Sequence, residues 1–169
     1  VLRQNKANRA AGGGFYAEDS STVLSGLVVA NNQCYSDNMG AQLLGGGVGL
    51  VRGRHQVVLS QIVNNFTQGQ GSGGYNVPDY PRGGGLYTSG DLLLRDCVVS
   101  NNTARIMSYG TSYGGGLFAD LIQAGTKTVV RNALVATNIS SRAGTSNMSE
   151  LGDGVYAANG TVQLESATV

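Results

Sequence analysis

The sequence predicts an all-β fold of the parallel β-solenoid class, in which each turn of the chain stacks on the turn before it. A glycine-rich opening recurs at residues 12, 45, 83, 114 and 152, and self-similarity at such a spacing is typical of stacked repeat architectures. The stretches after each opening, such as residues 22–24 and 92–94, are dominated by Val, Leu, Ile and Thr. This pattern favours strands over helices.

Each repeat begins with the glycine opening, which suits a tight corner because glycine adopts positive φ and permits close approach between rungs. The strand stretch follows, and the repeat ends with an apolar residue, two spacers and an asparagine. Asparagine tolerates the left-handed conformation, and its side-chain amide can bond to the same amide in neighbouring rungs. We therefore predict a structural asparagine ladder at a second corner, formed by Asn5, Asn32, Asn65, Asn102 and Asn138.

The spacing also predicts the number of turns. Val169 occupies the same place in its repeat as Leu2 does in the first, so we expect about five coils in one β-helix segment, residues 1–169. Neither end shows the polar capping unit that isolated solenoids need. We therefore expect uncapped ends, on which adjacent coils of the same or a neighbouring chain stack end to end.

The pairing of the two motifs resembles the polymorphic outer-membrane-protein repeats of right-handed parallel β-helices, within the pectin-lyase-like superfamily. The GG-x-apolar element is present at Gly12, Gly45, Gly83 and Gly114, and in the F-x-x-N element Val, Ile or Leu stands in place of Phe. The resemblance implies right-handed coiling and a surface or secreted passenger, so an extracellular or cell-surface location. Periodicity alone indicates only stacked strands.

Composition argues against several partners. Charged residues make up 12% of the 169 residues and the formal net charge is +1, whereas about 25% charged residues are usual. We therefore expect no nucleic-acid partner and, because no apolar run approaches 18 residues, no membrane insertion. Cys34 and Cys97 are predicted to lie two rungs, roughly 10 Å, apart, too far for a disulfide. Cys97 is expected to be a small core residue.

Residues that carry chemistry are sparse. Among ten carboxylates only Glu18 and Asp19 are adjacent, and a hard cation needs several converging oxygens. His55, the single histidine, has no partner at metal-ligand spacing, so we expect it to be a solvated turn residue. The prediction is no catalytic residue, no metal and no cofactor.

Aromatic residues form two groups. Tyrosines gather in the insertions between each asparagine corner and the next glycine opening, which should emerge from one edge: Tyr35, Tyr75, Tyr80, Tyr109 and Tyr113. Two interpretations stay open, a carbohydrate- or protein-contact edge and rings that only pin their own loops to the coil. A second line follows the glycine corners and is expected to stack and stabilise the coil, with Gly49 as a gap: Tyr16, Tyr87, Phe118 and Tyr156.

Five N-x-S/T sequons suggest covalent N-glycans. Asn65 and Asn138 coincide with the predicted ladder, so an inward structural role competes with glycan attachment. Asn101, Asn147 and Asn159 fall in turns or loops and are the better candidates.

Three functional hypotheses follow. The leading one is a glycosylated, non-catalytic structural rod of an extracellular surface adhesin or filament. The second is a carbohydrate- or protein-binding module that uses the tyrosine-bearing edge. The third, suggested by the superfamily resemblance, is a polysaccharide lyase-like enzyme.

Overall fold

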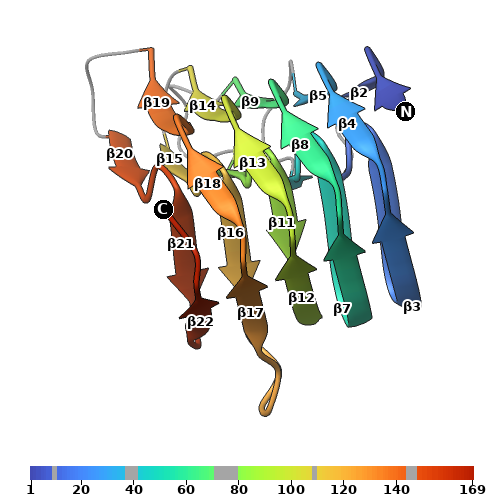
Figure 1. Ribbon diagram of the computed structural model, residues 1–169. Coiled ribbons are helices and arrows are strands. Elements are labelled where there is room, and N and C mark those ends of the chain that lie inside the picture. The colour runs from blue at the N-terminus through green and yellow to red at the C-terminus, as the bar shows by residue number, and fades with distance from the viewer. Residues whose placement is uncertain (9–10, 37–41, 71–79, 108–109, 144–147) are drawn as a thin grey trace.

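The chain is a parallel β-solenoid of about four turns (Figure 1). A computed structural model describes residues 1–169 apart from 9–10, 37–41, 71–79, 108–109 and 144–147. In the described part of the chain all regular elements are strands, and the strands of successive turns pair in parallel, one above another. The predicted fold class is therefore confirmed.

Each turn passes through four sheets in the order 1, 2, 3, 4. Sheet 1 contains β1 (Leu2–Arg3), β4 (Val28–Ala30), β8 (Gln61–Val63), β13 (Val98–Ser100) and β18 (Leu134–Ala136). Sheet 2 contains β2 (Lys6–Asn8), β5 (Gln33–Tyr35), β9 (Phe66–Gly69), β14 (Thr103–Ile106) and β19 (Ile139–Arg142). Sheet 3 contains β6 (Gln42–Leu44), β10 (Tyr80–Arg82), β15 (Gly110–Tyr113) and β20 (Met148–Leu151).

Sheet 4 is a bent limb with two halves. Its strands are β3 (Phe15–Ser25), β7 (Val48–Val58), β11 (Leu86–Thr88), β12 (Asp91–Arg95), β16 (Leu117–Asp120), β17 (Thr128–Arg131), β21 (Val155–Ala158) and β22 (Val162–Glu165). β3 and β7 each run 11 residues through the bend, whereas later turns divide into two strands. In Figure 1 the arrows of β11, β16 and β21 point down and those of β12, β17 and β22 point up. Each later turn therefore runs out along the limb and returns.

The turn count is lower than the spacing predicts. Sheet 1 holds five strands, β1 to β18, which are separated by four steps from rung to rung. The last stretch of the chain returns to this sheet only through an isolated bridge between Leu134 and Thr168. The expected fifth coil is thus incomplete, and the structure has about four turns.

The corners consist of residues with left-handed backbone. At the glycine corner, between sheets 3 and 4, the first glycine of each opening has φ between +57° and +72°. At the corner between sheets 1 and 2, the left-handed residues are Gln4, Asn31, Asn64, Asn101 and Thr137. The ladder asparagines come one residue later, so the expectation that they themselves adopt the left-handed conformation is wrong. The preceding residue makes the bend, which leaves the ladder side chain free to point inward.

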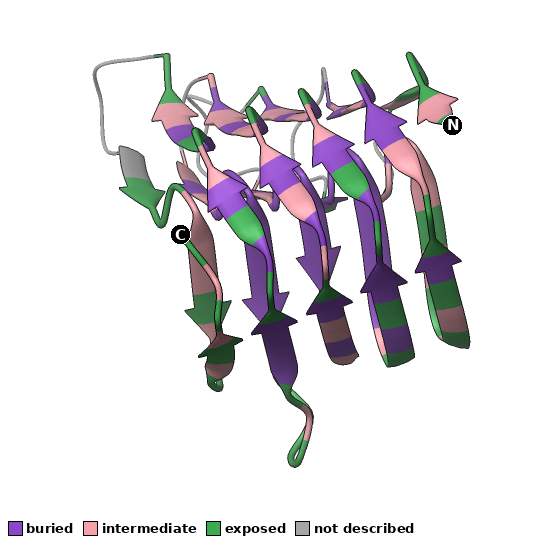
Figure 2. Cartoon of the chain, viewed as in Figure 1, coloured by how far each residue is buried: buried purple, intermediate pink, exposed green. Residues whose placement is uncertain are grey.

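The core lies between the sheets and weakens toward both ends of the stack. Inward columns such as Val29, Ile62, Val99 and Val135 are at most 1% exposed, and Cys97 belongs to the same cluster, as predicted. Figure 2 shows buried segments concentrated in the central rungs, with mixed exposure in β3, β21 and β22. Because each rung buries its apolar side chains only against its neighbours, the outermost described rungs are the least covered.

Candidate functional site

The five predicted ladder asparagines form one hydrogen-bonded column. The Oδ1 of Asn32, Asn65, Asn102 and Asn138 accepts bonds from the backbone N–H and the Nδ2 of the ladder asparagine one rung earlier, at 2.9–3.1 Å. The Nδ2 of each also donates to a sheet 1 carbonyl at 2.8–3.0 Å. These four side chains are at most 5% exposed, so the column satisfies buried amides that would otherwise be costly.

The sequons fall into two environments. Asn65 and Asn138 are buried in the ladder, whereas Asn101 and Asn159 are exposed corner residues with φ of +54° and +59°. Asn147 lies outside the described residues.

The hydroxyl residues of the two buried sequons have structural partners. Thr67 Oγ1 donates to the Gly83 carbonyl at 3.1 Å, and Ser140 Oγ donates to the Ser112 carbonyl at 3.0 Å. Both hydroxyl residues are buried in sheet 2. These two sequons therefore have an architectural explanation that does not involve glycans.

Part of the tyrosine-bearing edge packs against the aromatic residues that follow the glycine corners. Tyr75 and Tyr109 lie outside the described residues, and Tyr35 is half-buried in β5. Tyr113 packs against Tyr80, Phe118 and Tyr156, with ring centroids 6.4, 5.5 and 5.3 Å away. For Tyr80 and Tyr113 this geometry favours the interpretation that the rings pin the coil.

The glycine-corner aromatics stack along the solenoid. Tyr87 and Phe118 lie 5.6 Å apart with planes 6° from parallel, and Phe118 and Tyr156 lie 5.4 Å apart. Leu44 and Val51 pack against these rings and complete a second, smaller core in the angle between sheets 3 and 4. Tyr16 is in register with Gly49 and Tyr87, so the gap predicted at Gly49 interrupts the line of rings there.

An ion pair that the sequence reasoning missed lies on this second core. The Arg82 guanidinium lies over the rings of Tyr80 and Phe118, at 5.8 and 5.5 Å from their centroids. Its Nη1 is 3.3 Å from Asp120 Oδ2, and Asn159 Nδ2 donates to Asp120 Oδ1 at 3.0 Å. Asp120 is 5% exposed. A hollow of about 340 Å³ borders the pair, but the Asp120 oxygens are bonded to residues of the chain itself.

The single signal for this pair in the sequence was Arg82 placed directly before a glycine opening. Its partner Asp120 lies 38 residues away, one rung further along the stack. A spacing of that size between opposite charges becomes meaningful only after the register between rungs is known.

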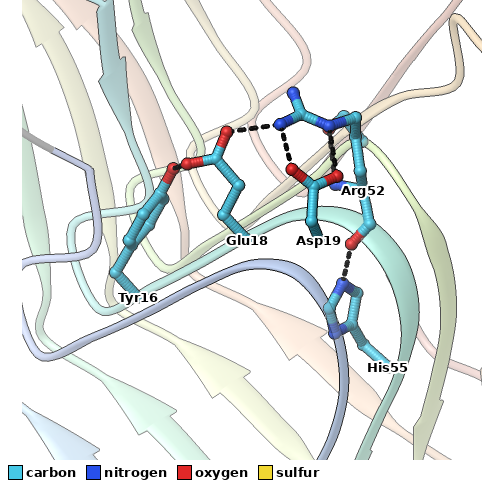
Figure 3. A network of polar contacts seen from close by, with 6 residues as sticks. Tyr16, Glu18, Asp19, Arg52 and His55 are labelled. Carbon is cyan, nitrogen blue, oxygen red and sulfur yellow. Dashed lines mark hydrogen bonds and ion pairs between the residues drawn. The ribbon is translucent and has the colours of Figure 1, made fainter.

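The adjacent acids Glu18 and Asp19 form an ion-paired network on the first bend of sheet 4 (Figure 3). Arg52 Nε and Nη2 contact both Asp19 oxygens at 2.6 and 2.5 Å, and Nη2 also contacts Glu18 Oε1 at 2.6 Å. Tyr16 donates its hydroxyl proton to Glu18 Oε2 at 2.7 Å. Both carboxylates are therefore directed at a neighbouring rung's guanidinium.

The network shifts the ionisation of its members. The Tyr16 hydroxyl and the Arg52 guanidinium hold the pKa of Glu18 below its usual value, and Arg52 does the same for the pKa of Asp19. Partial burial and the bond to Glu18 raise the pKa of Tyr16 to about 12. At neutral pH the carboxylates are thus charged and the phenol keeps its proton.

His55 is buried rather than a solvated turn residue, so that prediction is wrong. Its side chain is 2% exposed, and its Nε2 lies 2.5 Å from the Arg52 carbonyl oxygen (Figure 3). The bend at Arg52 and Gly53 lies within β7, and the second half of this strand places His55 at an inward position beside Thr22 and Leu92. Among the described residues, its Nδ1 has no hydrogen-bond partner.

A hollow lies on the outer face of the second half of sheet 4. It has a volume of about 530 Å³ and crosses β3, β7, β12 and β17, with Arg54, Asp91, Lys127 and Arg131 among its lining residues. Arg54 lies 3.8 Å from Asp91, and Arg131 pairs with Glu165. Both signs of charge are therefore present in the groove.

Among the residues that the structure describes, no group of three or more His, Cys, Asp and Glu side chains is arranged to hold a metal ion. Nor does that part of the chain include a helix long and apolar enough to cross a membrane.

Comparison with known proteins identifies no relative. The chain matches no protein-family model, no curated protein sequence and no solved structure. The class that the structure defines is the all-β parallel β-solenoid.

Proposed function

We propose that the chain is a stretch of a non-catalytic structural rod, part of an extracellular surface adhesin or filament that carries N-glycans. The observation that carries this proposal is that bonding between rungs extends from the core to the surface. Because side-chain bonds join each rung to the next along the solenoid axis, the molecule is suited to transmit load or to span distance.

The side-chain contacts at the surface join residues that lie about one repeat apart in the sequence. Arg52–Asp19, Arg131–Glu165, Asn132–Asp96 and Thr137–Asn101 join residues 33 to 36 positions apart. Each therefore connects one turn to the next at a corner or along sheet 4. Exposed pairs are individually weak, but they are added to a continuous hydrogen-bonded ladder in the core.

The two outermost described rungs support stacking of further coils. Leu2, Phe15 and Val155 occupy core columns yet are only partly buried, and Leu164 is 51% exposed. Coils of the same chain or of a neighbouring chain, placed end to end on these rungs, would continue the columns and cover these side chains.

The finer identity belongs to the same proposal. The glycine and asparagine motifs resemble polymorphic outer-membrane-protein repeats of the pectin-lyase-like superfamily, which implies a right-handed coil. Parallel strands joined by a crossover are right-handed in about 98% of cases, which supports the same hand.

Electron microscopy of the native material tests the rod. We expect elongated particles or filaments whose axial spacing follows the rung distance of about 4.8 Å, and intact mass that decreases on enzymatic deglycosylation. Compact particles that do not lengthen with concentration, at unchanged mass, would instead indicate a discrete domain.

A further inference from the structure

We infer that the fold determines which sequons can carry a glycan. Asn101 accepts an N-glycan, whereas a glycan on Asn65 or Asn138 is incompatible with the folded coil. The inference rests on the proposed secretion of the chain. In N-glycosylation the asparagine Nδ2 attacks C1 of an oligosaccharide carried on a lipid pyrophosphate. The Nδ2–C1 bond forms, the C1–O bond to pyrophosphate breaks, and one amide proton is lost to solvent.

Both side-chain amide hydrogens of Asn65 are donated to partners in the ladder. Its Nδ2 donates to the Val29 carbonyl at 2.9 Å and to Asn102 Oδ1 at 3.0 Å, so replacing either hydrogen by a sugar breaks a ladder bond. The residue is 1% exposed, and a Cβ placed on Gly47 would lie 2.8 Å from this Nδ2. A site that cannot admit one carbon atom cannot admit a sugar ring.

Asn138 lies in the same column two rungs further on and is excluded by the lack of space around it rather than by its donor bonds. Its Nδ2 donates to the Val99 carbonyl at 2.9 Å, and the residue is 5% exposed. A Cβ on Gly116 would lie 2.7 Å from the same nitrogen. Because glycosylation precedes folding, a sugar on either asparagine would trap that molecule before the coil closes.

Asn101 lies one residue before the ladder and is exposed. It is the left-handed residue at its corner, so its side chain diverges from that of the buried Asn102. Its Oδ1 accepts a bond from Thr137 Oγ1 at 2.8 Å, and a glycosylated amide retains this oxygen. A glycan here would extend outward from the corner between sheets 1 and 2.

Asn159 is compatible with a glycan on different grounds. It is exposed, and its Nδ2 donates one bond, to Asp120 Oδ1. A glycosylated amide keeps one N–H, which is sufficient for that bond. The fold therefore excludes two of the four described sequons and not the others.

The test is site-by-site glycan mapping in a secreting eukaryotic host. Secreted, protease-resistant protein and retained intracellular protein are deglycosylated enzymatically in ¹⁸O water, which labels each formerly occupied asparagine. We expect the label at Asn101 in the secreted fraction, and at Asn65 and Asn138 only in the retained fraction. Asn101→Gln should remove one glycan mass, whereas Asn64→Gln, at the same corner without a sequon, should remove none.

A second variant separates glycan exclusion from a folding defect. Thr67→Ala with Ser140→Ala destroys both ladder sequons and keeps both ladder asparagines, and alanine already occupies this sheet 2 column at Ala7 and Ala104. The double variant also loses the hydroxyl bonds of Thr67 and Ser140, and a bacterial host, which adds no glycan, measures that folding defect alone. We expect the yield of the variant relative to the native sequence to be higher in the glycosylating host than in the bacterial host.

Three results would overturn the inference: a label at Asn65 or Asn138 in secreted folded protein, an unlabelled Asn101 there, or a relative yield of the double variant that is the same in both hosts. These results leave the rod untouched, because its test is axial assembly. Correctly sorted glycans on particles that never elongate would refute the rod alone.

Discussion

Asn65 illustrates how much of the stack depends on single side chains. Its Oδ1 is the acceptor for two donors of Asn32, the backbone N–H and Nδ2, and both donors are buried. Removal of a buried partner costs the full desolvation penalty of the group left behind. The ladder is therefore vulnerable at every rung.

Asn65→Ala should lower the free energy of unfolding by about 2–5 kcal/mol, because both Asn32 donors and the Val29 carbonyl lose a bond and Asn102 Oδ1 keeps only the bond from the backbone N–H of residue 65. The shift of the urea midpoint measures this loss. The matched control is Asn64→Gly at the neighbouring exposed corner, where φ is +56° and glycine is tolerated, so a change within about 0.5 kcal/mol is expected. Equal losses for the two variants would contradict the ladder's role.

The Arg52 network predicts a response to acid. The folded-state pKa values of Glu18 and Asp19 are lower than their ordinary values of 4.5 and 3.8. Their contribution to stability is therefore complete above about pH 4.5 and is lost as the pH falls through the lowered folded values. Hydrogen exchange of β3 against pH, corrected for intrinsic exchange, should show protection that declines in this range.

The double variant Glu18→Gln and Asp19→Asn is the control for this acid response. It removes both titrating groups, and asparagine tolerates the left-handed φ of +49° at position 19. Its β3 protection should not change between pH 6 and pH 3 more than that of β12. A decline as steep as in the native protein would show that other groups are responsible.

At the scale of the secondary-structure elements, the corner between sheets 3 and 4 requires glycine because of close contacts between sheets and not only because of positive φ. The third glycine of each complete opening approaches the ladder: a Cβ on Gly85 would lie 2.8 Å from Asn102 Cγ and Nδ2 and from the Gly116 carbonyl oxygen. Two of these contacts involve a ladder side chain and one involves backbone. The glycine column and the asparagine column thus require each other.

Gly85→Ala should destabilise the protein by about 1–3 kcal/mol or more, because a fixed backbone atom or the ladder must move. The control is Gly26→Asn, where φ is +65°, no atom of a described residue lies within 4 Å of the added Cβ, and Asn132 takes the same corner position three rungs away at φ +45°. That variant should be nearly neutral. Thermal unfolding of both variants checks the difference, and a neutral Gly85→Ala would refute the close-contact argument.

Tyr113 tests the two interpretations of the tyrosine edge. Tyr113→Ser should lower the free energy of unfolding by about 2–4 kcal/mol, since it removes two ring contacts of the second core and the burial that accompanies them. Tyr35→Ser, in β5 outside this cluster, should cost less. Denaturant melts of both variants provide the comparison. An unchanged melt for Tyr113→Ser would restore the contact-edge interpretation for that ring.

At the scale of the whole molecule, a stack in which each rung contacts only its neighbours should lose stability from its ends. The central columns are nearly inaccessible, whereas Tyr16 and Leu164 at the outer rungs are 42% and 51% exposed. We expect amide exchange to be slowest in β7, β11 and β12 and faster in β3 and β22. Uniform protection across all rungs would indicate one cooperative unit.

Much of this architecture could be predicted from the sequence. The repeated openings and the asparagine spacing determine a parallel solenoid and identify the ladder residues, because a repeat forces like residues into register. The same periodicity identifies the stacked aromatic line. Each of these features is present within a single repeat, and stacking places its copies next to one another.

Only the tertiary structure could determine how the rungs meet away from those columns. The bend at Arg52 and Gly53 made His55 a buried residue, although nothing in its immediate sequence distinguishes it from a surface turn. The angle between sheets 3 and 4 placed Arg82 over Phe118 and against Asp120 in the next rung. The insertions vary in length from repeat to repeat, so the register that brings such residues together is established by strand pairing and side-chain packing, and the spacing of residues along the chain does not contain it.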